Sequence, residues 1–381
     1  MTDSTTNSRQ RISLRRIAPA IVLICLLLDA SLRFLSPSLW AFRGWEALSA
    51  FATGNSPFIR NGFYWNPRSY GDLTNIGNLP QMRQYREDVF TSDANGYRNR
   101  GEVAKPFQGI LLLGDSFAVG AAVRDDETLS VQLANISGCP VYNGGSSPDS
   151  LELLNHLQMN RGLVVWEQSE RTPIPQFPLL DNPKPRWEIR LVSNVLGAER
   201  TELLQQLTKY SPLQIIFGRA VRVFQNDKIL PNPFHEVARA RLRNGRDILF
   251  GQKEVENYEL DRSTDPAYFV ALKTQLEEKG IGLLVLLVPD KYVVYHDLIA
   301  PPSPLPERRP FLDIVEDRLV ADQVPVVNLT PHFREEARTL LDRNQYIYWM
   351  DDTHWNAEGT HDAAQALAES NTVSQLSCRN R

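Results

Sequence analysis

Short unbroken apolar runs alternate with longer amphipathic stretches along most of the chain. The runs have the pattern of strands buried on both faces, and we expect them at 110–113, 140–143, 163–166, 281–288 and 324–329. Stretches with helical spacing lie between or after them, at 127–136, 150–160, 266–279, 310–322 and 357–369. This alternation predicts an α/β domain, in which helices cover both faces of a mostly parallel sheet.

The turn after the first strand carries the first candidate for chemistry. Gly114, Asp115 and Ser116 follow the run 110–113 where a loop should lead into a helix. Ligands of open α/β sheets bind at the carboxyl ends of the strands. Ser116 is therefore either a nucleophile beside the amides of the next helix, or an ordinary N-cap serine.

The second candidate lies far downstream, in Asp351-Asp352-Thr353-His354. A serine becomes a nucleophile when a base takes its proton and a carboxylate orients that base. His354 has acidic residues two and three positions before it, although acids also gather at helix starts for electrostatic reasons. Right-handed crossovers would bring Ser116 and His354 to the same edge of the sheet.

Together, the Gly-Asp-Ser-Phe motif at 114–117 and the Asp-x-His-Trp-Asn motif at 352–356 resemble the SGNH (GDSL-type) hydrolase-like superfamily. Within it, the resemblance is to the alginate O-acetyltransferase branch of AlgX/AlgJ-like domains. The segments 90–99, 166–171 and 288–295 carry the same resemblance, which spans roughly 90–367. It implies a flavodoxin-like three-layer sandwich.

The resemblance also implies roles for individual residues. Ser116 would be the nucleophile and His354 its base. AlgX/AlgJ-like proteins use the acid two positions before the histidine, here Asp352, whereas hydrolytic members use the one three before, here Asp351; we favour Asp352. The amides of Ser116 and Gly145 would form the oxyanion hole, with Gly144 as the neighbouring alternative and a plain turn as the other interpretation.

The chain departs from the hydrolytic pattern after the third strand. Hydrolytic members carry an asparagine there that donates to the oxyanion, but here Glu167-Gln168-Ser169-Glu170-Arg171 follows, as in the AlgX/AlgJ-like pattern. Arg171 would bind an anionic sugar, or form a structural ion pair with Glu167 or Glu170. Lys291, after the fourth strand, would likewise contact an acidic sugar or tie nearby carboxylates.

The first 40 residues differ from the rest. Four arginines between positions 9 and 16 precede an apolar run at 17–28, which is typical of a signal sequence or signal anchor. We favour an uncleaved single-pass anchor with the body outside the cytoplasm; a buried soluble helix is the alternative. Cys25 lies in this anchor, and Cys139 and Cys378 would be free to pair in an oxidising compartment.

The expected organisation is a cytoplasmic basic tail and anchor at 1–39, an irregular lead-in at 40–105, and a catalytic domain at 106–381 with one insertion at about 172–265. The net charge of −4 gives no basic field for nucleic acid. The sequence has no zinc-type Cys/His cluster, and the proposed chemistry requires neither metal nor cofactor.

The resemblance, together with the expected anchor, implies an extracytoplasmic O-acetyltransferase of the inner membrane, which would transfer acetyl groups to alginate or a similar polysaccharide through an acetyl-serine. The resemblance further implies an acetyl donor presented by a multi-spanning membrane O-acyltransferase. Two alternatives stay open: a membrane-tethered esterase or deacetylase with the same triad, and a non-catalytic polysaccharide-binding component of a secretion complex.

Overall fold

The computed structural model describes residues 14–52, 56–147, 150–175, 211–226, 236–260, 262–302, 308–376 and 378. The basic tail before residue 14 and the first part of the insertion, 176–210, lie outside the described residues. The expectations for those two segments are therefore not addressed by the structure.

A five-stranded parallel sheet forms the centre of the molecule, with strand order β4-β3-β5-β8-β9. Its strands are β3 (Gly109–Leu113), β4 (Val141–Asn143), β5 (Gly162–Ser169), β8 (Ile281–Val288) and β9 (Val326–Asn328). These confirm the α/β prediction. β5 is longer than expected, because Glu167, Gln168 and Ser169 continue its pairing with β8. The polar segment after the third run therefore begins inside the sheet.

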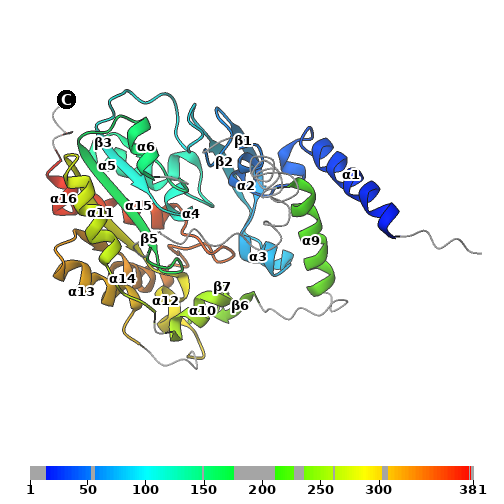
Figure 1. Ribbon diagram of the computed structural model, residues 1–381. Helices are drawn as coiled ribbons and strands as arrows, with labels where there is room; N and C mark the ends of the chain where they lie inside the picture. Colours follow the sequence, from blue (N-terminus) through cyan, green and yellow to red (C-terminus); the bar gives the residue numbers. More distant parts are fainter. Residues whose placement is uncertain are drawn as a thin grey trace, which may run out of the picture.

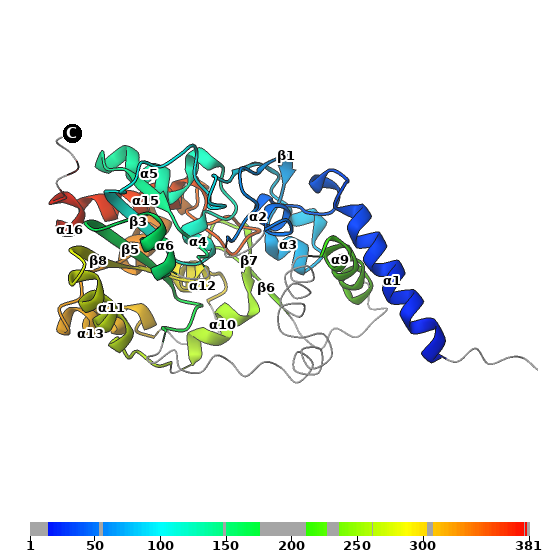
Figure 2. The same cartoon turned by 45° about the horizontal axis from the view of Figure 1, so that its top comes forward.

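Helices cover both faces of the sheet, which gives the three layers seen in Figures 1 and 2. One apolar cluster joins Ile110 and Leu112 of β3 to α5 (Leu129–Ser137), α14 (Thr330–Leu341) and α15 (Ala357–Glu369). The other joins Leu111 and Leu113 to α6 (Ser150–His156), α11 (Ala267–Glu277) and α13 (Phe311–Ala321). Successive residues of one strand point to opposite faces, so β3 contributes to both layers.

Shorter helices lie at the ends of these elements. They are α4 (Ser116–Val119), α12 (Lys291–Tyr295), α16 (Asn371–Ser374), η3 (Asp125–Glu127) and η4 (His296–Leu298). Of these, α4 and α12 directly follow the carboxyl ends of β3 and β8, the edge where ligands of parallel sheets bind.

The lead-in is more ordered than its sequence suggested. β1 (Phe63–Ser69) pairs with β2 (Arg86–Thr91) in antiparallel fashion, beside α2 (Gly44–Ser49), α3 (Asp72–Ile76), η1 (Pro37–Leu39) and η2 (Pro80–Met82). It has its own apolar cluster, which includes Trp40, Phe58 and Phe90. Gly71, just before α3, lies so close to the loop at Asp351 that a Cβ there would sit 1.8 Å from the Asp351 carbonyl oxygen. Only glycine permits this approach.

The described part of the insertion contains α9 (Pro212–Asn226), the antiparallel hairpin β6 (Val237–Arg241) and β7 (Asp247–Gly251), and α10 (Gln252–Glu259). α9 packs against α1 (Leu14–Leu32), which projects from the body (Figures 1 and 2). Asp29 of α1 accepts a hydrogen bond from the Leu213 amide at 3.1 Å. Among the helices of the described ranges, none is both long and apolar enough to cross a membrane.

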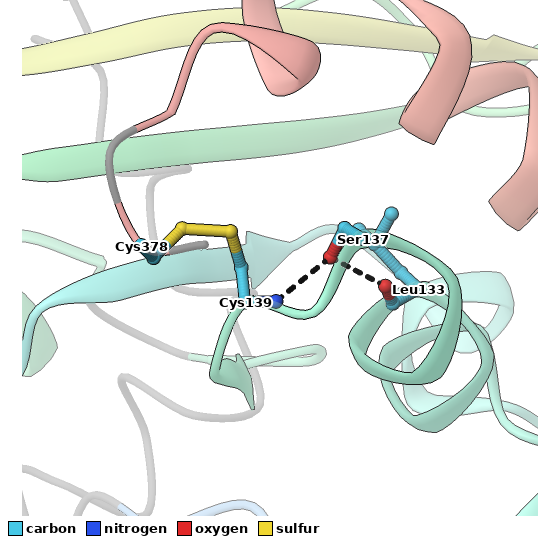
Figure 3. The surroundings of a disulfide bond; sticks show 4 residues. All are labelled: Leu133, Ser137, Cys139 and Cys378. Atoms are coloured by element: carbon cyan, nitrogen blue, oxygen red, sulfur yellow. Dashed lines mark hydrogen bonds between the residues drawn. A yellow bond between two sulfur atoms is a disulfide. The ribbon is translucent and has the colours of Figure 1, made fainter. Parts of the chain in front are cut away.

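A disulfide joins Cys139 and Cys378, whose Cα atoms lie 5.3 Å apart although 239 positions separate them in sequence (Figure 3). Cys139 lies just before edge strand β4, and Cys378 follows α16. The structure thus confirms the pairing hypothesis. The bond ties the carboxyl-terminal segment to the edge of the sheet.

We predict that Cys378→Ser lowers the free energy of unfolding by about 2–4 kcal/mol, because the bond constrains a long loop in the unfolded chain. Urea unfolding followed by circular dichroism measures the change. Cys25→Ser, which removes the exposed thiol of α1, is the matched control and should leave the midpoint unchanged. Equal midpoints for Cys378→Ser and the wild type would contradict the prediction.

Candidate active site

Asp115 fixes the turn that carries Ser116. Its Oδ1 accepts a hydrogen bond from the Phe117 amide at 2.9 Å, which caps α4. Its Oδ2 accepts from the hydroxyls of Ser169 at 2.6 Å and Thr172 at 2.8 Å. Burial opposes the charge, but these hydrogen bonds and the nearby positive charge of Arg171 lower the pKa of Asp115 below its ordinary value. Ser116 is therefore the first residue of α4, and hydrogen bonds to Asp115 hold the turn that precedes it.

Ser116, His354 and Asp352 form a continuous hydrogen-bonded chain. Ser116 Oγ lies 2.8 Å from His354 Nε2, and His354 Nδ1 lies 2.7 Å from Asp352 Oδ1. Burial alone would raise the pKa of Asp352, yet the hydrogen bond and charge of His354 and the charges of Arg86 and Arg43 hold it well below its ordinary value. An ionised Asp352 places the imidazole proton on Nδ1 and leaves Nε2 to accept from Ser116.

Asp351, the alternative acid, faces away from His354 and toward the lead-in. Its Oδ2 accepts hydrogen bonds from the amides of Gly71 and Gln84, each at 2.8 Å, and its Oδ1 pairs with Arg86 at 2.9 Å. Of the two acids that the sequence left open, the geometry places Asp352 on the histidine. Asp351 attaches the same loop to the lead-in.

Sequence reasoning missed two residues of the lead-in that reach this loop. Arg86 spans both acids, with Nη1 on Asp351 and Nη2 2.8 Å from Asp352 Oδ2, and its guanidinium stacks on the Trp349 ring. Asp72 accepts from the Thr353 amide at 2.9 Å and from the Thr353 hydroxyl at 2.7 Å. Nothing in their local sequence marks either residue, because the partners lie more than 260 positions away.

Lys291 is a support of the loop rather than a surface cation. Its side chain is fully buried, and Nζ donates to the carbonyl oxygens of Asp352 at 2.7 Å and Trp349 at 3.1 Å. Burial lowers the pKa of Lys291 to about 8. The expectation that Lys291 contacts an acidic sugar is therefore wrong, because its ammonium has no access to solvent. Its hydrogen-bond partners are backbone carbonyls and not the carboxylates that the sequence suggested.

Arg171 lies beside the nucleophile and keeps part of its surface exposed. Its Nε pairs with Asp290 at 3.0 Å and its Nη2 donates to the Thr353 carbonyl at 3.0 Å. The guanidinium sits 4.8 Å over the ring of Phe117, the neighbour of Ser116. The expected ion pair with Glu167 or Glu170 is not formed. Arg171 pairs instead with Asp290, in the turn between β8 and α12, and lies near Glu254 of α10. Sequence position could not reveal these partners.

Of the amides expected to form an oxyanion hole, only that of Ser116, the first residue of α4, is without an acceptor among the described residues. The Gly145 amide, however, donates to Asn143 Oδ1 at 3.0 Å, and that of Gly144 donates to the Leu112 carbonyl at 2.7 Å. A glycine is required at 145 for packing, since a Cβ would lie 2.6 Å from the Val119 nitrogen. The structure therefore contradicts Gly145 and Gly144 as free donors.

Buried carboxylates gather behind the site. Burial, with the charge of Asp115, raises the pKa of Glu167 well above its ordinary value. Burial and the charge of Asp290 raise that of Glu170 to about 8, and burial raises that of Glu254 to about 7. Neither oxygen of Glu254 has a hydrogen-bond partner among the described residues, although Arg171 lies 3.7 Å away.

A metal ion does not fit the acids of this site. In the part of the chain that the structure describes, only Asp72, Asp352 and His354 lie close enough to share an ion. Their carboxylate oxygens already accept from amides, from the Thr353 hydroxyl, from Arg86 and from the imidazole. These donors already occupy the carboxylate oxygens that a metal ion would need.

A pocket of about 200 Å³ opens beside the nucleophile turn. Its lining includes Gly114, Asp115, Trp166, Ser169 and Thr172. Most of this lining is apolar surface, to which Asp115, Ser169 and Thr172 add a few polar groups, as is usual for small-ligand pockets.

We predict that the raised pKa of Glu254 makes stability fall as pH rises. The folded state holds a proton that the unfolded chain releases near pH 4.3, so this stability is lost between about pH 4.3 and 7, on the order of 3 kcal/mol. Thermal unfolding at pH 5 and pH 8 should therefore show a smaller loss in Glu254→Gln than in the wild type. Glu256→Gln, on the exposed side of α10, is the matched control, and equal losses in all three proteins would contradict the prediction.

Comparison with known families bears on the fold and on the chemistry of this site. Residues 245–377 match the family described as SGNH hydrolase-like domain, acetyltransferase AlgX. The match contains Asp352 and His354, whereas Ser116 and the lead-in lie outside it. A search of curated proteins found no match. Together with the parallel sheet, this match over the carboxyl-terminal third of the chain supports an SGNH hydrolase-like domain of the AlgX-like branch.

Proposed function

We propose that this protein is an O-acetyltransferase that acetylates alginate or a similar exported polysaccharide through an acetyl-Ser116 intermediate. The observation that carries the proposal is the Ser116–His354–Asp352 chain at the carboxyl edge of an AlgX-like domain. A nucleophile, a base and an orienting acid within hydrogen-bond distance are the parts that acyl transfer needs.

The reaction runs in two half-steps. His354 Nε2 takes the Ser116 proton while Oγ attacks the acetyl carbonyl of the donor, and the same proton then goes to the departing group. This leaves acetyl-Ser116 and the free donor group. A sugar hydroxyl next gives its proton to His354 and attacks the acetyl carbonyl, and His354 returns that proton to Ser116. Ionised Asp352 stabilises the imidazolium of each half-step.

The developing oxyanion requires donors that the protein does not already use. The Ser116 amide meets this condition in the described residues, and we assign it as one donor. We propose the partly exposed Arg171 guanidinium as the source of positive charge nearby, since it lies over Phe117 beside the nucleophile. Preorganised donors of this kind are typically worth about 10²- to 10³-fold in rate each.

We further propose that the protein works outside the cytoplasm, attached to the inner membrane by α1. The Cys139–Cys378 disulfide supports an oxidising compartment. Apolar side chains of α1 are each about half exposed, namely Ile21, Val22, Leu23 and Ile24. Such an uncovered apolar surface is what a helix in contact with a membrane presents. The acetyl donor would be presented there by a multi-spanning membrane O-acyltransferase, an implication of the AlgX-like resemblance.

An esterase or deacetylase is the second candidate, because the Ser116–His354–Asp352 chain would serve hydrolysis equally well. Water would then replace the sugar as acceptor, with every protein group in the same role. The two activities differ only in which acceptor reaches the intermediate first.

The test measures acetyl transfer from a chromogenic acetyl ester to defined oligosaccharides by the full chain. We expect acetylated sugar with the wild type, and a transfer rate lower by a factor of about 10⁴ or more with Ser116→Ala. Ser374→Ala, an exposed serine of α16, is the matched control and should match the wild type. Acetate release that is unaffected by added sugar would establish the esterase instead, and full transfer by Ser116→Ala would overturn both.

We predict that Asp352→Asn lowers kcat for acetyl release more than Asp351→Asn does. The new amide would keep its oxygen toward Arg86 and the Asp72 nitrogen, both donors, and turn its NH₂ toward His354 Nδ1. The imidazole would then carry its proton on Nε2 and lose its function as a base, a change worth up to about 10⁴-fold elsewhere. Asp351→Asn should mainly lower the melting temperature, and the reverse ranking of the two kcat values would refute Asp352 as the orienting acid.

A further inference from the structure

The imidazole of His354 faces a second carboxylate besides Asp352. Asp72 Oδ2 lies 3.8 Å from His354 Nδ1. The Thr353 hydroxyl contacts both groups, 3.2 Å from Nδ1 and 2.7 Å from Asp72 Oδ2. A carboxylate only accepts, so this hydroxyl donates to Asp72 and turns its lone pairs toward the imidazole. The Nδ1 proton thus has two acceptor routes, one directly to Asp352 and one through Thr353 to Asp72.

We propose that Asp72 is a second acid of the catalytic histidine: a positioning residue from the lead-in that stabilises the imidazolium through Thr353 and replaces Asp352 when that carboxylate is removed. This inference rests on the proposed function of Ser116 and His354. It also extends the site beyond the matched family region, because Asp72 and its helix α3 lie outside residues 245–377.

Hydrogen-bond donors and a guanidinium surround the carboxyl group of Asp72. Its Oδ1 accepts from the Thr353 amide at 2.9 Å, and Arg43 Nη1 lies 3.6 Å from its Oδ2. The side chain is buried, so these donors act with little competition from water. Burial lowers and the charges of Glu46, Asp72 and Asp352 raise the pKa of Arg43, with a net rise, and the guanidinium stays charged. A charged acid near Nδ1 favours the protonated imidazole that each half-step forms.

Several other charges surround the same imidazole and must stay constant in any comparison. They are Asp351 and Asp352 on its own loop, Arg43 and Arg86 from the lead-in, Arg171 from the end of β5, and Lys291 from the start of α12. Asp290 and Glu254 face Arg171 from behind. Single substitutions at Asp72 leave all of these in place.

The proposal gives an unusual order of activities at position 352. In Asp352→Asn the new NH₂ occupies the space before Nδ1 and blocks the route to Asp72. In Asp352→Ala that space is empty, so the Nδ1 proton can turn to the Thr353 hydroxyl and Asp72. The larger truncation should therefore keep more activity than the isosteric amide, the opposite of what loss of packing alone predicts.

The decisive experiment measures kcat for acetyl release from a chromogenic ester by full-length variants. Asp352→Ala should be at least about tenfold more active than Asp352→Asn, and the double variant Asp72→Asn with Asp352→Ala should fall to the level of His354→Ala. Circular dichroism and melting curves identify folded variants. A double variant no worse than Asp352→Ala would overturn the proposal, as would an Asp352→Asn variant more active than Asp352→Ala.

A second measurement does not depend on the stability of the Asp352 variants. Asp72→Asn alone should shift the acidic limb of the kcat/KM profile to lower pH, because the imidazole then loses its proton more readily, while KM stays unchanged. Glu46→Gln, which removes an acid next to Arg43 but does not touch the loop, should leave the limb in place. An unshifted acidic limb in a folded Asp72→Asn protein would show that Asp72 has only a structural role. Full activity of Ser116→Ala would instead refute the proposed function itself, so the two failures are distinguishable.

Discussion

The site depends on one buried contact between two parts of the chain: the Arg86 guanidinium across Asp351 and Asp352. All three side chains are at most 8% exposed, so neither acid has water to stabilise it. Removing one partner of such a buried pair typically costs about 3–5 kcal/mol, because a charge is left uncompensated. The lead-in is therefore a structural half of the acid site, and the loop with His354 is held between it and the sheet.

This arrangement explains why so many charges can be buried around one loop. Lys291 supports the loop from the sheet side through two carbonyls, while Arg171 holds the Thr353 carbonyl from the nucleophile side. The chain thus fixes the loop backbone from three directions and leaves the His354 ring to bridge Ser116 and Asp352. Behind Arg171, Asp290 pairs with the guanidinium at 3.0 Å and Glu254 lies 3.7 Å from it, and burial of these groups carries a cost in desolvation. Rigid support of this kind is what a preorganised catalytic group requires.

The parts of the fold that repeat a local pattern were accessible from the sequence. The apolar runs gave the strands, β8 at its observed bounds, and the motifs around Ser116 and His354 gave two ends of the site. The rest depended on contacts between distant segments. Arg86 and Asp72 lie in a polar, aperiodic stretch, and only the folded chain shows that they meet Asp351, Asp352 and Thr353. The sugar contact expected of Lys291 was wrong for the same reason. A lysine after a buried strand is expected to be exposed unless the loop that covers it is known.

The account makes one central claim, that Ser116 carries the acetyl group between donor and acceptor. The most direct test incubates the full chain with an acetyl ester, quenches with acid, and locates acetylated residues by peptide mass spectrometry. The account predicts an acetyl group on Ser116 that accumulates without sugar and disappears when an acceptor oligosaccharide is added. An acetyl group on another residue, or none on Ser116 while acetylated sugar still forms, would contradict it.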